Sequence, residues 1–138
     1  MTDQGEGSAG NIRFEVREHP AHVELVCVGA YFPGAQLYVA KEAFAAASRA
    51  GRSAALVDVR QVAGPAPTMS ERYDQAVKVA QLQSSITPRI RLALLGHEPM
   101  VHPQRFGEIV ATNRGALLRV FTDEAMALEW LLAKPKTP

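Results

Sequence analysis

The chain has 138 residues, of which 47% are hydrophobic, so it has the length of one domain with a core of useful size. Fifteen lysines and arginines against fourteen aspartates and glutamates give a net charge of +1, which excludes the strong field that recruits nucleic acid or an anionic membrane. The single cysteine, Cys27, excludes an internal disulfide and a multi-cysteine zinc site and favours a reducing cytoplasm.

The N-terminal segment 1–11 lacks the basic and apolar regions of a signal peptide, and we expect it to be disordered. No apolar run in the sequence approaches the roughly 18 residues of a membrane span, so we expect a soluble chain without membrane insertion. The run "IRFEVRE" (12–18) alternates apolar and polar residues, and "HVELVCVGA" (22–30) does the same after the turn "HPA". This pattern predicts a β-hairpin.

A helix is predicted over residues 33–51, because apolar residues recur at helical spacing and Gly51 stands where a C-terminal cap is expected. The short strand "AALVDV" (54–59) follows, and Asp58 and Arg60 mark its predicted end. Since this strand is apolar almost throughout, we expect it to be buried on both faces, as strands of parallel sheets are.

The stretch "AGPAPTMSERY" (63–73) leads from that strand into a second predicted helix. Thr68 and Glu71 have the spacing of a capping box. In this motif the threonine hydroxyl accepts a hydrogen bond from the glutamate amide, and the glutamate carboxylate accepts one from the threonine amide. The first interpretation of the stretch is therefore a helix start.

The rest of the chain alternates strands and helices. A strand over 90–96 and a loop over 97–104 precede a helix that turns Phe106, Ile109 and Val110 inward and ends at 113–115. A strand over 116–121 and a helix over 122–133 complete the domain, with Trp130 expected to be buried against the sheet.

The order of these elements predicts an α/β fold. Its sheet is mixed and mainly parallel, with about five strands and four helices, and it begins with the N-terminal hairpin. We expect one domain over residues 12–133, and a loose C-terminal tail over 134–138.

Ligands of open α/β sheets usually bind outside the carboxyl ends of the parallel strands. The loops at this edge should bring together aromatic, hydroxyl and imidazole groups that suit a small pocket. These residues are Tyr31, Phe32, Arg60, Thr68, Ser70, Tyr73, His97 and His102. Met100 is expected to join Tyr31, Phe32 and Tyr73 if the pocket is an enclosed cavity.

The sequence supports a catalytic or metal-binding site less well than it supports a small binding pocket. His97, Glu98 and His102 lack a third histidine and a reliable ligand spacing, so no metal is expected. A hydrolase built on Ser70, His97 and Asp58 would lack the "GxSxG" elbow, and the sequence has no glycine-rich phosphate loop. Cys27, in an apolar strand, is expected to pack rather than to react. We therefore expect no catalytic residues and no cofactor.

Several site residues have two interpretations. Arg60 either binds an anion or pairs with Asp58 or Glu71. Tyr31 and Phe32 are either core aromatics or part of a ligand site. Thr68 and Ser70 either begin a helix or accept a phosphate, which would meet free helix amides with Arg60 and Arg72 in reach. Ser70 is the better acceptor, since Thr68 would lose its capping bond.

Three segments carry a resemblance to a known family. "ALVDVR" (55–60), "ERY" (71–73) and above all "RFGEIVATNRGALLRVFTDEAMALEWL" (105–131) resemble the SpoIIAA-like proteins, which are related to STAS domains and more distantly to CRAL-TRIO domains. The resemblance implies a mixed sheet whose first strand is antiparallel to the rest. It also implies a switchable protein-binding module, as in the anti-sigma-factor antagonists, or a site for lipophilic molecules, as in CRAL-TRIO domains.

The sequence departs from the antagonist pattern at one point. The antagonists carry an Asp, two hydroxyl residues and a Gly at their phosphorylation site, whereas "APTMSERY" (66–73) has Thr68 and Ser70 without that Asp or Gly. We therefore expect a cytoplasmic, non-catalytic domain that binds a protein partner. The alternatives are a domain for a small lipophilic or anionic ligand and, third, a hydrolase; a homodimer stays open.

Overall fold

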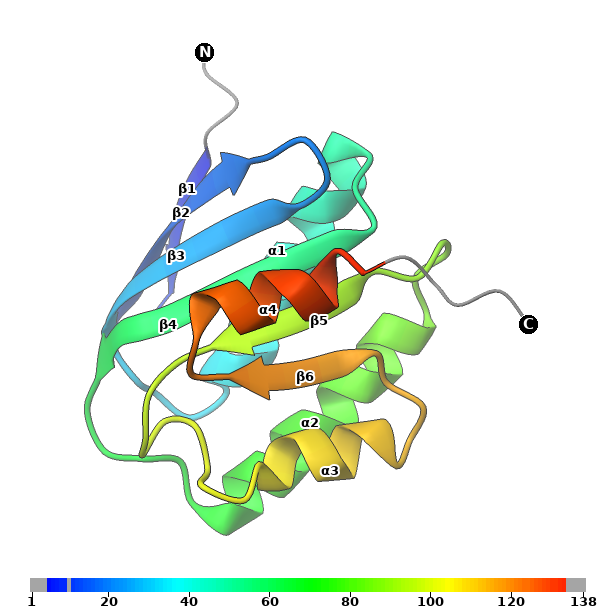
Figure 1. Cartoon of the computed structure of the whole chain (residues 1–138). Helices are drawn as coiled ribbons and strands as arrows, with labels where there is room; N and C mark the ends of the chain where they lie inside the picture. The colour runs from blue at the N-terminus through cyan, green and yellow to red at the C-terminus, as the bar shows by residue number, and fades with distance from the viewer. Residues whose placement is uncertain (1–4, 10, 134–138) are drawn as a thin grey trace.

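The computed structural model describes residues 5–9 and 11–133, which form a six-stranded sheet and four helices (Figure 1). The strands lie in chain order across the sheet; β1, β2 and β3 are antiparallel, and β3 to β6 are parallel. The elements are β1 (Gly5–Ala9), β2 (Ile12–Glu18), β3 (Val23–Ala30), α1 (Ala35–Ala50), β4 (Ala54–Ala63), α2 (Met69–Ser84), β5 (Arg91–Leu95), α3 (Phe106–Thr112), β6 (Leu118–Phe121) and α4 (Glu124–Leu131). The predicted α/β class and the hairpin β2–β3 are confirmed.

The helices divide between the two faces of the sheet (Figure 1). α1 and α2 cover one face and enclose the main core with β2 to β5, while α4 packs on the other face over β4, β5 and β6. α3 lies against α2 and β6. The alternation predicted for β2 is confirmed, because Ile12, Phe14 and Val16 are buried in the main core. Gly51 ends α1 at φ +69°, a conformation that favours glycine.

The prediction of a disordered segment 1–11 is wrong for Gly5–Ala9. These residues form β1 and pair with β2 from Gly5 opposite Val16 to Ala9 opposite Ile12. Strand pairing uses backbone amides and carbonyls, which small residues supply without any apolar pattern in the sequence. The sheet therefore has six strands instead of about five. Residues 1–4 and 10, and the tail predicted over 134–138, lie outside the described residues.

β4 extends beyond its predicted end at Asp58 and Arg60. Its pairing with β3 shifts between Val26 opposite Asp58 and Val28 opposite Gln61, so β4 carries an extra residue there. This is a β-bulge, which bends a strand locally without ending it. Asp58 and Arg60 consequently lie within the strand, and the loop to α2 begins only after Ala63.

Two burial predictions need correction. Ile109 is 49% exposed, whereas its neighbour Val110 is buried against α2, because the seven-residue α3 packs through a narrow face. Trp130 is half-buried instead of buried. Its ring lies 5.9 Å from that of Phe121, and the guanidinium of Arg91 covers it at 5.0 Å.

Candidate functional site

The N-terminus of α2 begins with the predicted capping box. Glu71 N donates to Thr68 Oγ1 at 3.1 Å, and Thr68 N donates to Glu71 Oε1 at 3.2 Å. Ser70 lies between them in the first turn and is exposed. The helix-start interpretation of "AGPAPTMSERY" is confirmed in its geometry, and it leaves the Ser70 side chain accessible.

Glu71 also joins α2 to the end of β3. The Tyr31 hydroxyl donates to Glu71 Oε2 at 2.6 Å, so both carboxylate oxygens are occupied. The bond from Tyr31 and the backbone bond from Thr68 hold the pKa of Glu71 below its usual value, while burial and the bond to Glu71 raise the pKa of Tyr31. One carboxylate thus caps the helix and anchors the segment that follows β3.

Arg72 holds the loop after β5. It is 7% exposed, and it donates to the carbonyl of Pro99 at 2.7 Å and to that of Met100 at 3.0 Å. Burial lowers its pKa. Since its guanidinium is committed to these carbonyls, Arg72 positions residues 97–105 over the end of the sheet and does not lie free beside Ser70.

A small apolar cavity lies beneath these contacts, between α1, α2 and the strands β4 and β5. Its volume is about 90 Å³. Tyr31, Pro67 and Met100 line it at the end next to Glu71, and Gln36 of α1 also lines it. A second hollow of about 80 Å³ shares Gln36 and Met100 and continues toward Arg72 and His102. Of the four residues expected around a cavity, Tyr31 and Met100 line the first cavity.

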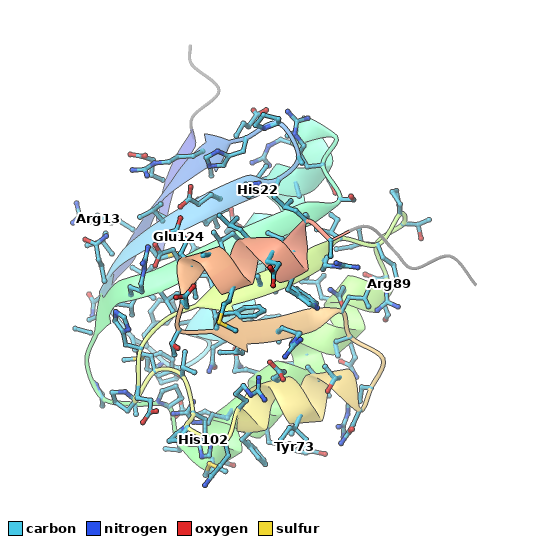
Figure 2. The ribbon with its side chains drawn as sticks, viewed as in Figure 1. Arg13, His22, Tyr73, Arg89, His102 and Glu124 are labelled. Atoms are coloured by element: carbon cyan, nitrogen blue, oxygen red, sulfur yellow. The ribbon has the colours of Figure 1, made fainter. Side chains whose placement is uncertain are left out.

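The other predicted site residues are dispersed. Arg60 lies on the α4 face, where it donates to both oxygens of Asp58, at 3.1 and 2.8 Å, and to Glu124 at 3.0 Å. The bonds to Asp58 raise its pKa first of all. The geometry therefore supports the interpretation that Arg60 pairs with Asp58. Arg60 is remote from Ser70. Figure 2 shows Glu124 at the start of α4, far from the end of the domain that carries Tyr73 and His102.

Phe32, His97 and His102 have separate environments. Phe32 packs against the main core, with its ring 6.2 Å from that of Tyr38. His97 is exposed. His102 Nδ1 accepts from the Gln104 amide at 3.1 Å. The site residues that the fold brings together are thus Tyr31, Thr68, Ser70 and Arg72, through Glu71 and the loop after β5.

Within residues 5–9 and 11–133, no three His, Cys, Asp or Glu side chains gather where they could hold a metal ion. Both oxygens of Asp58 are engaged by Arg60, so Asp58 is not placed to orient His97 beside Ser70. Cys27 is fully buried, and burial raises the pKa of its thiol to about 12. A thiol with that pKa is a poor nucleophile at neutral pH.

An exposed surface, here named the α2–α3 surface, adjoins Ser70. It consists of Met69 and Tyr73, one turn apart on α2, with Ile109 of α3 and Arg114 just beyond it. Met69 is 49% exposed and Tyr73 47%. Arg114 donates to the Tyr73 hydroxyl at 2.8 Å and stacks over its ring at 5.2 Å. Large apolar side chains, an aromatic ring and a guanidinium are therefore displayed together.

Sequence reasoning missed the roles of Gln36 and Gln75. Both are polar residues on the apolar faces of their helices, next to Ala35 and Ala76, and that position was the available signal. Gln75 Oε1 accepts from the Leu37 amide at 2.9 Å and thereby ties α2 to α1. Gln36 lines the cavity.

The comparisons with known proteins concern the fold. Similar to this chain is the crystal structure of an anti-sigma factor antagonist from Mycobacterium paratuberculosis, with a TM-score of 0.55 and 11% identity over 87% of this chain and 93% of the other. An uncharacterized DUF3478 protein with a SpoIIAA-like fold from Shewanella loihica PV-4 has a TM-score of 0.48 and 17% identity over 92% and 99%. No family model and no curated protein matches. The resemblance to SpoIIAA-like proteins is confirmed as a likeness of fold.

Within residues 5–9 and 11–133, no helix is long enough and apolar enough to cross a lipid bilayer.

Proposed function

We propose that the chain is a non-catalytic, cytoplasmic regulatory domain that binds a protein partner through the α2–α3 surface. The observation that carries this proposal is the exposure of Met69, Tyr73 and Ile109 beside Arg114 on two adjoining helices. Methionine, aromatic residues and arginine are enriched where protein partners meet. The fold shared with a protein described as an anti-sigma factor antagonist supports a regulatory role.

The charges around the α2–α3 surface indicate which charge the partner should carry. Exposed Arg114 follows α3 and contacts the Val110 carbonyl and Tyr73, whereas Arg105 before α3 lies 3.9 Å from Glu108, and Asp74 and Lys78 neutralise each other at 3.0 Å. The surface is therefore apolar at its centre and carries the positive charge of Arg114 at its border. The partner that fits is a protein with an apolar groove bordered by aspartates or glutamates, because opposite potentials favour encounter and register.

Ser70 is the proposed switch of this interface. Its exposed hydroxyl lies in the first turn of α2, where free helix amides favour a phosphate. A phosphate on Ser70 adds a charge of about −2 beside the α2–α3 surface. Because the proposed partner is acidic, this charge should repel it. Thr68 is the poorer acceptor, because its hydroxyl is already bonded to the Glu71 amide.

Site-specific photocrosslinking in the host tests the proposal. Benzoylphenylalanine at position 73 should give a discrete adduct with one other protein. The same group at position 13, an exposed site on β2, is the matched control and should not give that adduct.

The purified partner then allows quantitative tests. Ser70→Asp should weaken its binding at least tenfold, whereas Ser84→Asp, exposed at the far end of the same helix, should not. The proposal fails if the adduct forms equally from position 13, if it joins two copies of this chain, or if Tyr73→Ala leaves the affinity unchanged.

A further inference from the structure

The 90 Å³ cavity between α1, α2, β4 and β5 is lined mainly by apolar side chains. Val57 of β4, Val79 of α2 and Leu92 of β5 form its walls, and Tyr31, Pro67 and Met100 lie at the end toward α2. A well-packed domain has few voids larger than a water molecule. This one runs along the face of the sheet that α1 and α2 cover, where Val57 and Val59 of β4 and Leu92 and Leu94 of β5 line it.

Gln36 places an unsatisfied acceptor in this cavity. Its Oε1 atom is buried and has no hydrogen-bond partner among the described residues, although Gln36 lines the cavity. Gln36 itself is partly buried, and the two buried glutamines, Gln75 and Gln83, show the usual arrangement. Gln75 Oε1 accepts from the Leu37 amide at 2.9 Å, and Gln83 Oε1 from the Leu117 amide at 2.7 Å. A buried acceptor without a donor is costly, so Gln36 marks a place for a donor from outside the chain.

We propose that the cavity binds a small, uncharged and mainly apolar molecule whose single polar group donates a hydrogen bond to Gln36 Oε1. The lining contains no charged residue among those the structure describes, and Glu71 and Arg72 beside it are committed to Tyr31 and to loop carbonyls. An ionised ligand would lose its hydration without gaining a counter-charge. The expected ligand is therefore an alcohol or phenol class molecule and not an anion.

The volume limits the size of this molecule. An apolar cavity of about 150 Å³ is known to hold benzene, so the cavity of about 90 Å³ alone fits a short chain, and a single ring also needs space from the adjoining hollow of about 80 Å³. Met100 adds room, because it separates this cavity from the hollow of about 80 Å³ that it also lines. An unbranched methionine changes rotamer easily and can admit a ligand along this path.

The test compares two ligands of equal shape, phenol and toluene, of which phenol alone carries a donor. Binding is followed in the folded, full chain by the NMR shifts of the methyl groups of Val57, Val79 and Leu92. Phenol should bind saturably at these methyls. Gln36→Leu should weaken phenol binding about tenfold, the equivalent of one hydrogen bond, and should preserve or strengthen the binding of toluene.

Three controls keep the test decisive. Gln81→Leu, at an exposed position of α2, should leave both affinities unchanged. Gln36→Met replaces Gln36→Leu if the latter does not fold. Ala40→Leu fills the cavity from α1 and should abolish both bindings. The proposal is overturned if phenol causes no saturable shift at the cavity methyls, or if Gln36→Leu weakens phenol and toluene by the same factor. It stands apart from the partner proposal, because no partner is present in the test.

Discussion

Replacing Thr68 by alanine tests the structure of the α2 N-terminus directly. The substitution removes the bond from the Glu71 amide to Thr68 Oγ1, at 3.1 Å, and leaves the other half of the capping box in place. The freed amide is near the surface and can bond to water. We therefore expect a loss of about 1 kcal/mol in the free energy of unfolding, within the range of about 0.5–2 kcal/mol typical of such caps.

The assay is urea unfolding followed by the fluorescence of Trp130, the only tryptophan of the chain. Its half-buried ring against Phe121 should become exposed on unfolding. A loss of about 1 kcal/mol corresponds to a decrease of about 3–5 °C in the melting temperature of a domain of this size. The slope of the unfolding free energy against urea should not change, since the folded state stays intact.

Two substitutions serve as controls for this prediction. Thr68→Ser keeps the hydroxyl and should retain most of the stability. Ser70→Ala, at an exposed site without a capping bond, should change the unfolding free energy by less than about 0.5 kcal/mol. Equal losses from Thr68→Ala and Ser70→Ala, or no loss from Thr68→Ala, would refute the assignment of Thr68 as the cap.

Trp130→Ala should lower the free energy of unfolding by about 2 kcal/mol, which is less than the loss for a fully buried tryptophan, because the ring is half-buried against Phe121 and Arg91. Urea unfolding followed by circular dichroism measures this loss. Cys27 should not react with iodoacetamide in the folded protein at pH 7 and should react on unfolding, since its pKa is raised to about 12; fast labelling without denaturant would contradict its burial. Burial first, and then the charge of His19, lower the pKa of His22 in the folded protein. As the pH drops below 6.5, His22 is therefore protonated in the unfolded chain before it is in the folded one, and the free energy of unfolding should fall. His22→Gln should lessen that fall, and identical curves of unfolding free energy against pH would refute the prediction.

The sequence predicted best those features that depend on neighbours within a few residues. The capping box of Thr68 and Glu71 and the glycine cap at Gly51 each involve residues within one or two helical turns, and both are present. The alternation of β2 likewise has a fixed period of two. Local geometry leaves few other arrangements for such patterns.

Features that depend on distant pairing could not be predicted. The bond from Tyr31 to Glu71 joins residues 40 positions apart, and the anchoring of Pro99 by Arg72 joins residues 27 apart. Arg60 was expected near Ser70 because a strand end was assumed at position 60. β4 continues through the bulge, and the alternation of Leu56, Asp58 and Arg60 places Arg60 on the α4 face, where it bonds to Asp58 and Glu124. The end of the strand, which depends on pairing with β3, was the part that the sequence did not reveal.

Glu71 connects the two proposed sites. Its carboxylate accepts from Tyr31, which lines the cavity, and its neighbour Ser70 adjoins the α2–α3 surface. A negative charge at position 70 would repel this carboxylate and weaken the support of Tyr31 at the cavity. If both proposals hold, Ser70→Asp should therefore weaken phenol binding even though Ser70 does not line the cavity. If Glu71 couples the two sites, phenol changes the affinity for the partner, and by linkage the partner changes the affinity for phenol by the same factor. Titrating phenol with and without saturating partner measures that factor, and a value of one would show that Glu71 does not couple the sites.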